Sequence, residues 1–136
     1  MFDPVTLIKK ALEARENAYS PYSRFCVGAA LICSDGELFL GANVENSSFG
    51  GTICAERSAF CAAISQGKRD FEAISIVGGF KDKQIEKLCA PCGICRQFMT
   101  EFNYDMELII AKANGEYKVW SLKQLLPEAF TPESLL

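Results

Sequence analysis

The sequence predicts an α/β fold, in which a mixed sheet of about five strands lies between two layers of helices. Segments with helical periodicity alternate along the chain with short apolar segments bounded by turn residues. Two of the apolar segments end at Asp-Gly or Asn-Gly, the pairs that favour tight β-hairpins. The length of 136 residues and the apolar fraction of 49% suit one domain with one core, residues 1–136.

Four segments are expected to be helical. Asp3 as N-cap and Pro4 at the first helical position begin an amphipathic pattern that predicts a helix to about Tyr19. The other three helices are expected to begin near Cys54, near Pro91-Cys92 and at the capping-box sequence 121–124. The second helix is expected to end at Gly67, since glycine commonly follows the last residue of a helix.

Five segments are expected to be strands, because they are short, apolar and bounded by turn residues. They cover residues 25–33, 38–42, 73–79, 107–113 and 117–120. Between the second strand and the second helix, residues 43–52 form a polar loop. Loops of this kind often carry functional sites, so this loop is expected to contribute to one.

The charge and hydropathy of the chain exclude several classes of function. With 14 basic and 17 acidic residues the net charge is −3, and no basic cluster interleaves with aromatic residues, which argues against a polynucleotide partner. No apolar run approaches the roughly 20 residues that span a bilayer. The first residues lack the pattern of a signal peptide, so a cytoplasmic location is expected.

Three of the seven cysteines lie at predicted helix starts. Cys92 and Cys95 are one helical turn apart, and Cys54 begins another helix. The chain has no histidine, so a metal would be held by sulfur or oxygen, and thiolates favour zinc, copper(I) or an iron–sulfur cluster over magnesium or calcium. If the two helix starts converge, three sulfurs can bind one Zn²⁺ per chain and leave a fourth position open, as in catalytic zinc sites.

The residues beside these cysteines suggest how the site works. Glu56 lies two positions after Cys54, so it does not face the metal with that sulfur and is free to act as a general acid and base. Three thiolates make zinc overly negative, and positive helix N-termini would offset that charge. Arg57 and Arg96 are close enough in sequence to donate hydrogen bonds to the thiolates.

Other interpretations of the cysteines remain open. The Cys92-x-x-Cys95 pair could be a redox dithiol, and with Cys89 it could contribute to an iron–sulfur cluster. Cys89 could also be the fourth ligand of a purely structural zinc. The remaining cysteines are expected to be small core residues, namely Cys26, Cys33 and Cys61.

Five motifs in order resemble the small homotetrameric cytidine deaminases of the three-cysteine zinc type. The motifs begin at Phe25 (Phe-x-Val-Gly-Ala-Ala), Asn43 (Asn-Val-Glu-Asn), Cys54 (Cys-Ala-Glu-Arg), Pro91 (Pro-Cys-Gly-x-Cys-Arg-Gln) and Leu125 (Leu-Leu-Pro-x-x-Phe). The resemblance covers nearly the whole chain. It implies hydrolytic deamination of cytidine and 2′-deoxycytidine to uridine and 2′-deoxyuridine in pyrimidine salvage, with Glu56 transferring protons between water activated by zinc and the base.

The resemblance also implies residues that bind the nucleoside. Asn43 and Glu45 correspond to a pair that binds the ribose 3′-hydroxyl, and Phe25 would lie against the pyrimidine. Backbone groups near Ala55 could read the edge of the base. Phe130 corresponds to a residue that one subunit lends to the pocket of its neighbour, which would require a homo-oligomer. The chain departs from the family pattern in having Phe49 where relatives often have tyrosine, and Cys89 is additional.

Two alternative functions are weighed against this one. Enzymes that deaminate cytosine nucleoside antibiotics such as blasticidin S share the cysteine motifs, although the pair Asn43 and Glu45 favours a ribose. A non-catalytic structural zinc module would bind the metal in the same way but would leave Glu56 without a role.

Overall fold

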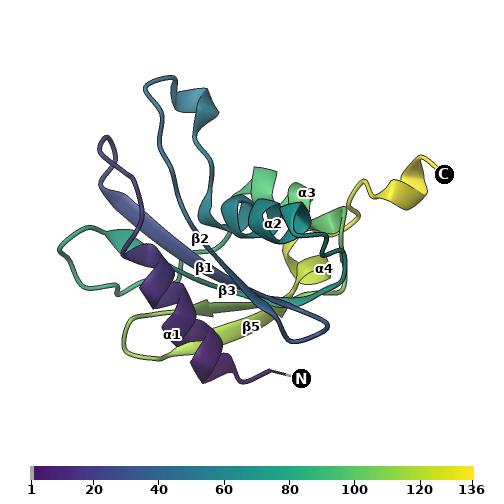
Figure 1. Cartoon of the computed structure of the whole chain (residues 1–136), viewed down its shortest axis with the longest axis horizontal. Coiled ribbons are helices and arrows are strands. Elements are labelled where there is room, and N and C mark those ends of the chain that lie inside the picture. The colour runs from purple at the N-terminus through teal and green to yellow at the C-terminus, as the bar shows by residue number, and fades with distance from the viewer. Residues whose placement is uncertain (1) are drawn as a thin grey trace.

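The computed structural model describes residues 2–136 and contains one sheet of five strands between helices (Figure 1). The strand order is β2-β1-β3-β4-β5. Only β3 and β4 are parallel among the neighbouring pairs, so the sheet is mixed, and the predicted fold class is confirmed. The strands are β1 (Phe25–Cys33), β2 (Leu38–Ala42), β3 (Phe71–Phe80), β4 (Glu107–Ala111) and β5 (Tyr117–Ser121).

Both predicted hairpins form at the glycine turns. Gly36 connects β1 to β2 with φ +90°, and Gly115 connects β4 to β5 with φ +95°. Residues with a Cβ atom rarely adopt this left-handed backbone conformation, whereas glycine adopts it without steric cost. Local sequence therefore determined the position of both turns.

Helices cover both faces of the sheet (Figure 1). On one face lies α1 (Pro4–Arg15), whose N-cap Asp3 accepts a hydrogen bond from the Val5 amide at 3.2 Å. The opposite face carries α2 (Ala55–Ser65) and α3 (Gly93–Thr100), and the short α4 (Leu122–Leu125) follows β5. The predicted capping box at Ser121 is present. Within residues 2–136, the helices are too short or too polar to cross a membrane.

The first helix is shorter than its periodicity predicted. It ends at Arg15 rather than near Tyr19 because the backbone of Tyr19 pairs with the loop that follows β2. The Tyr19 amide donates to the Asn43 carbonyl at 2.9 Å, and the Glu45 amide donates to the Tyr19 carbonyl at 2.8 Å. A contact between segments distant in sequence has therefore replaced the last helical turn.

The core has two parts, one on each face of the sheet. Between the sheet and α1 lie Leu7, Ile8 and Ala11, whereas Phe60 of α2 packs against Phe71 at a ring-centroid distance of 4.9 Å on the other face. Cys26 and Cys33 are buried as predicted. The prediction for Cys61 was wrong, since it lies on the exposed face of α2.

The alanines of α2 allow this helix to lie very close to β2. A Cβ atom at Gly41 would lie 2.3 Å from the Ala55 carbonyl oxygen and 2.4 Å from the Ala59 amide nitrogen. We expect Gly41→Ala to lower the free energy of unfolding by about 3 kcal/mol, because backbone atoms of α2 cannot yield as a flexible side chain would. Urea denaturation measures this loss.

Gly50 provides the matched control, since a Cβ atom there would meet no heavy atom within 4 Å. Gly50→Ala is expected to change the free energy of unfolding by less than about 0.5 kcal/mol. Equal losses in the two variants would show that close packing of α2 on β2 is not the cause.

Candidate metal centre and substrate pocket

Three sulfur atoms meet where α2 and α3 begin. Cys54 is the N-cap of α2, Cys92 is the N-cap of α3, and Cys95 lies in the first turn of α3. Their Sγ atoms all lie within 4.8 Å of one another, and those of Cys54 and Cys92 are 3.6 Å apart. Sulfurs bound tetrahedrally at about 2.3 Å from zinc lie about 3.8 Å apart, so the donor set fits Zn²⁺.

Neighbouring groups favour the thiolate form of Cys54. A hydrogen bond with the Cys95 thiol and another with Arg57 lower the pKa of Cys54 to about 5. The same hydrogen bond between the two cysteines raises the pKa of Cys95. Of these two sulfurs, Cys54 therefore loses its proton first. Arg57 Nη2 donates to Cys54 Sγ at 3.5 Å and to the Thr52 carbonyl at 3.3 Å. The guanidinium and the two helix N-termini therefore offset negative charge at the sulfurs.

Glu56 is buried beside the sulfurs in the first turn of α2, with 4% of its surface exposed. Burial raises the pKa of its carboxyl group to about 7, and the negative charge of Cys54 acts in the same direction. A carboxyl group that exchanges its proton near neutral pH is suited to general acid and base catalysis. Glu56 can therefore transfer protons beside a metal held by the three sulfurs.

Cys54, Cys92 and Glu56 line a cavity of about 230 Å³ that also receives residues from β1 and from the loop after β2, whereas the third sulfur, that of Cys95, is buried behind the lining. The predicted site residues Phe25, Asn43, Glu45, Ala55 and Glu56 all line it. The remaining lining residues are Ser23, Val27, Thr52, Cys54, Cys89, Ala90 and Cys92. The fold thus brings segments 23–27, 43–56 and 89–92 to one place.

Asn43 and Glu45 are held rigidly in this cavity. Asn43 accepts from the Val27 amide at 2.9 Å and donates to the Phe25 carbonyl at 2.8 Å, which leaves one amide hydrogen for a ligand. Glu45 accepts from the Tyr22 amide at 2.9 Å and the Ser23 amide at 3.1 Å, and also from the Ser23 hydroxyl. The Ser23 hydroxyl lowers the pKa of Glu45, so its carboxylate can accept hydrogen bonds from ligand hydroxyls.

Arg96 and Phe130 lie differently from the other predicted site residues. Arg96 donates to the carbonyl oxygens of Pro91 and Leu125 rather than pointing at a sulfur. Phe130 lies outside the lining of the cavity, and 59% of its surface is exposed. The ring is therefore accessible to solvent or to another molecule.

Two residues have roles in the site that the sequence did not indicate. Ser23 orients Glu45, and only the tertiary contact between their loops reveals this. Cys89 lines the cavity and covers Gly78, where a Cβ atom would lie 2.7 Å from the Cys89 sulfur. Burial raises the pKa of Cys89 to about 11, and its sulfur is not in the group of three. Cys89 is therefore a protonated wall residue beside the metal ligands.

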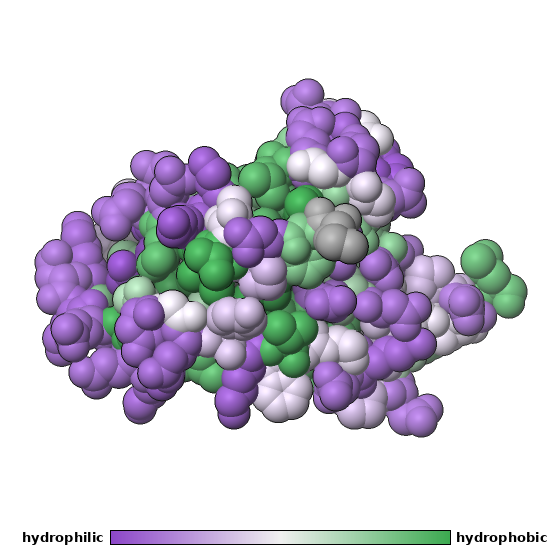
Figure 2. Space-filling model, turned by 90° about the horizontal axis from the view of Figure 1, so that it is seen from below, coloured by the Kyte–Doolittle hydropathy of each residue, from purple (hydrophilic) through white to green (hydrophobic). Residues whose placement is uncertain are grey.

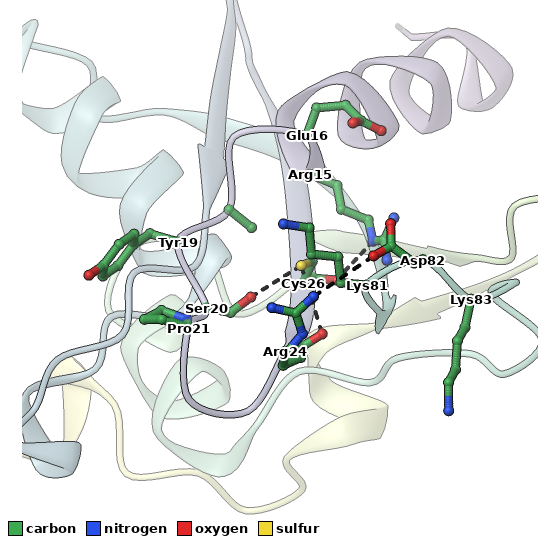
Figure 3. Close-up of a pocket in the computed structure, with 11 residues that line it drawn as sticks. Arg15, Glu16, Tyr19, Ser20, Pro21, Arg24, Cys26, Lys81, Asp82 and Lys83 are labelled. Atoms are coloured by element: carbon green, nitrogen blue, oxygen red, sulfur yellow. Dashed lines mark hydrogen bonds and ion pairs between the residues drawn. The ribbon is translucent and has the colours of Figure 1, made fainter.

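A second hollow, of about 520 Å³, lies where α1 meets the sheet (Figure 3). Its arginines have partners within the chain: Arg15 donates to the carbonyl oxygens of Cys26 at 3.0 Å and Gly79 at 2.8 Å, and Arg24 pairs with Asp82 at 3.8 Å. These contacts tie the end of α1 to β1 and β3. We therefore assign the residues around this hollow a structural role rather than a binding role.

The fold and the site together define a class of protein, an α/β fold in which cysteines at two helix starts can hold zinc beside a buried glutamate. Residues 3–112 match the family model described as the cytidine and deoxycytidylate deaminase zinc-binding region. The chain belongs to this family, and its cofactor is zinc, which the cluster of Cys54, Cys92 and Cys95 could hold.

Relatives match over nearly the full length of the chain. The cytidine deaminase of Halalkalibacterium halodurans is 46% identical over 98% of each chain, and the probable cytidine deaminase of Dictyostelium discoideum is 43% identical over 95% of this chain and 87% of that one. Among solved structures, the cytidine deaminase of Burkholderia pseudomallei superimposes with a TM-score of 0.88 at 44% identity, covering 95% of this chain and all of the other. That of Mycobacterium tuberculosis has a TM-score of 0.79 at 38% identity, covering 96% and 98%.

Proposed function

We propose that the protein catalyses the hydrolytic deamination of cytidine and 2′-deoxycytidine to uridine and 2′-deoxyuridine, with release of ammonia. The observation that carries this proposal is one cavity in which a buried glutamate and two sulfurs of the three-cysteine cluster lie together with a fixed amide and a fixed carboxylate. Glu56 provides the proton transfer, and Asn43 and Glu45 provide hydrogen-bonding groups for ribose.

The lining residues suggest how the nucleoside lies. The ribose 3′-hydroxyl donates to Glu45 and accepts from the free amide hydrogen of Asn43. The pyrimidine then lies toward Phe25 and the start of α2, where backbone groups at Ala55 read its edge. This orientation brings C4 of the base toward Glu56 and the three sulfurs.

The reaction needs two proton transfers. Cys54, Cys92 and Cys95 would hold zinc, which would lower the pKa of a water molecule and so supply the nucleophile for C4 of the base. Glu56 accepts the proton released from this water and delivers it to N3 of the ring. It then carries a second proton, from the hydroxyl group that the attack has placed on C4, to the amino group; the C4–N bond breaks as the C4 carbonyl forms, and ammonia leaves. Burial of Glu56 keeps its proton affinity high enough for both transfers.

Cytidine and blasticidin S incubated separately with the purified protein test the proposal. We expect the ultraviolet absorbance of cytidine to change to that of uridine, in a sample that contains one zinc per chain. Deamination of the antibiotic alone would contradict the proposal and establish the alternative substrate class.

Arg57→Ala is expected to weaken turnover of cytidine by about 10- to 100-fold while zinc remains bound, because the hydrogen bond to Cys54 Sγ is lost but the three ligands remain. Zinc per chain and the initial rate in the same sample measure both quantities. Arg69→Ala is a suitable control, since this arginine donates only to carbonyl groups near the end of α2. Loss of zinc from the Arg57 variant would contradict the expected division of roles.

We further infer that the chain is a single catalytic domain that assembles into a cytoplasmic homotetramer for pyrimidine salvage. The volume of the cavity supports this assembly. It is about 230 Å³, whereas ligand pockets usually measure at least roughly 300 Å³, and a smaller cavity is expected where a neighbouring subunit completes the pocket. Exposed apolar side chains such as Phe49, Ile94 and Phe130 offer contact surface. Light scattering coupled to size-exclusion chromatography tests the assembly, and an active monomer would refute it.

A further inference from the structure

Arg96 connects two segments that contribute to catalysis in different ways. It follows Cys95 in the first turn of α3, and its side chain is half-buried. Nε donates to the Pro91 carbonyl at 2.8 Å, and Nη1 donates to the Leu125 carbonyl at 2.7 Å. One guanidinium therefore holds the residue before the metal ligand Cys92 and the last residue of α4.

The segment after Leu125 is held at further points. The Tyr104 hydroxyl donates to the Leu126 carbonyl at 2.6 Å and accepts from the Ala129 amide at 3.2 Å. Gln97, next to Arg96, donates through Nε2 to the Phe130 carbonyl at 2.8 Å. The backbone of residues 125–130 is thus fixed on α3 and the residues after it.

The side chains at this end of the chain contrast with that fixed backbone. The ring of Phe130 is 59% exposed, and Leu135 and Leu136 are 77% and 100% exposed. Figure 1 shows the C-terminal segment leaving the body of the molecule, and Figure 2 shows its apolar end projecting beside a mostly polar surface. A held backbone that presents an exposed aromatic ring has the features of an arm that contacts another molecule.

We propose that Arg96 is a positioning residue that fixes the loop of Cys92 and the segment of Phe130 relative to each other. This inference rests on the proposed function, in which a neighbouring subunit completes the pocket, and it takes Phe130 as the exposed aromatic side chain that makes this contact. Arginine suits this task because its planar fork reaches two acceptors at once, whereas the ammonium group of lysine is a single point of contact. The position of Phe130 toward the neighbour's substrate then depends on the same side chain that fixes the metal loop.

Hydrogen exchange and kinetics of Arg96→Ala, Phe130→Ala and the double variant test the proposal. In Arg96→Ala the hydrogen-bonded amides of Leu126 and Ala129 are expected to exchange about tenfold faster. The KM for cytidine is expected to rise about tenfold in each single variant and no further in the double variant, because Arg96 acts through Phe130. Arg96→Lys preserves the charge and one hydrogen bond, so it is expected to give intermediate exchange and KM values and to fold if the alanine variant does not.

Two results would overturn the proposal. One is amide exchange at Leu126 and Ala129 that is as slow in the Arg96 variants as in the wild type. The other is a fold increase in KM in the double variant that equals the product of the fold increases in the two single variants. Such a result would mean that Arg96 and Phe130 act independently. The exchange measurement needs no turnover, so the exchange rates alone decide whether Arg96 holds the segment. A wild-type protein that fails to deaminate cytidine would refute the proposed function without changing that result.

Discussion

Glu56→Gln is expected to reduce turnover of cytidine by about 10²- to 10⁴-fold, the contribution typical of a general acid–base residue, while zinc content and thermal stability stay unchanged. Glutamine has the shape of the carboxyl group and fits the same buried position, but it cannot take up and release a proton. Because Cys54, Cys92 and Cys95 remain, the metal is still held. Single-turnover kinetics with zinc analysis in the same sample measures the effect.

Glu16→Gln is the matched control, because Glu16 is an exposed residue beside the second hollow and carries the same charge change. Its turnover is expected to equal that of the wild type. If Glu56→Gln retains full activity, the proton-transfer mechanism is wrong, and the non-catalytic zinc module becomes the better interpretation.

Cys95→Ser is expected to remove both zinc and activity. Cys95 is fully buried in the first turn of α3 and is one of the three cysteines whose sulfurs could hold the metal. A serine hydroxyl stays protonated at neutral pH and binds zinc weakly, so two thiolates are left to hold the ion. Zinc per chain after dialysis is expected to fall to near zero, and no turnover of cytidine should remain.

Cys89→Ser distinguishes a catalytic zinc from a structural one. Cys89 lines the same cavity, but its sulfur lies outside the group of three. The variant is therefore expected to retain zinc at the wild-type level, although its KM for cytidine can change because a wall of the pocket has changed. Loss of zinc in this variant would indicate four sulfur ligands and a closed site, which leaves no position for water.

Features that depend on neighbouring residues were predictable from the sequence. Gly36 and Gly115 determine the hairpin turns because their left-handed φ excludes most other residues. The cap at Asp3 and the capping box at Ser121 mark helix starts for an equally local reason. The (i, i+3) spacing of Cys92 and Cys95 likewise follows from the geometry of one helical turn.

Features that depend on distant segments were not predictable in this way. Tyr19 has helical periodicity, yet its backbone pairs with residues 43–45, and Cys61 has the small apolar side chain of a core residue but lies on the outer face of α2. Arg96 adjoins a metal ligand in sequence, but carbonyl groups at Pro91 and Leu125 take its hydrogen bonds. Helical periodicity and sequence spacing contain no information about which acceptor a long side chain reaches.

The sequence by itself determined the types of chemical group in the site: three thiolates, one carboxyl group free of the metal, and an amide and a carboxylate in the preceding loop. The tertiary structure decided how these groups act. Packing of α2 and α3 on one face of the sheet brings Cys54 within 3.6 Å of Cys92 and buries Glu56, whose pKa rises for that reason. Distance and burial arise only when segments far apart in the chain come together, because each depends on every element that packs around the site.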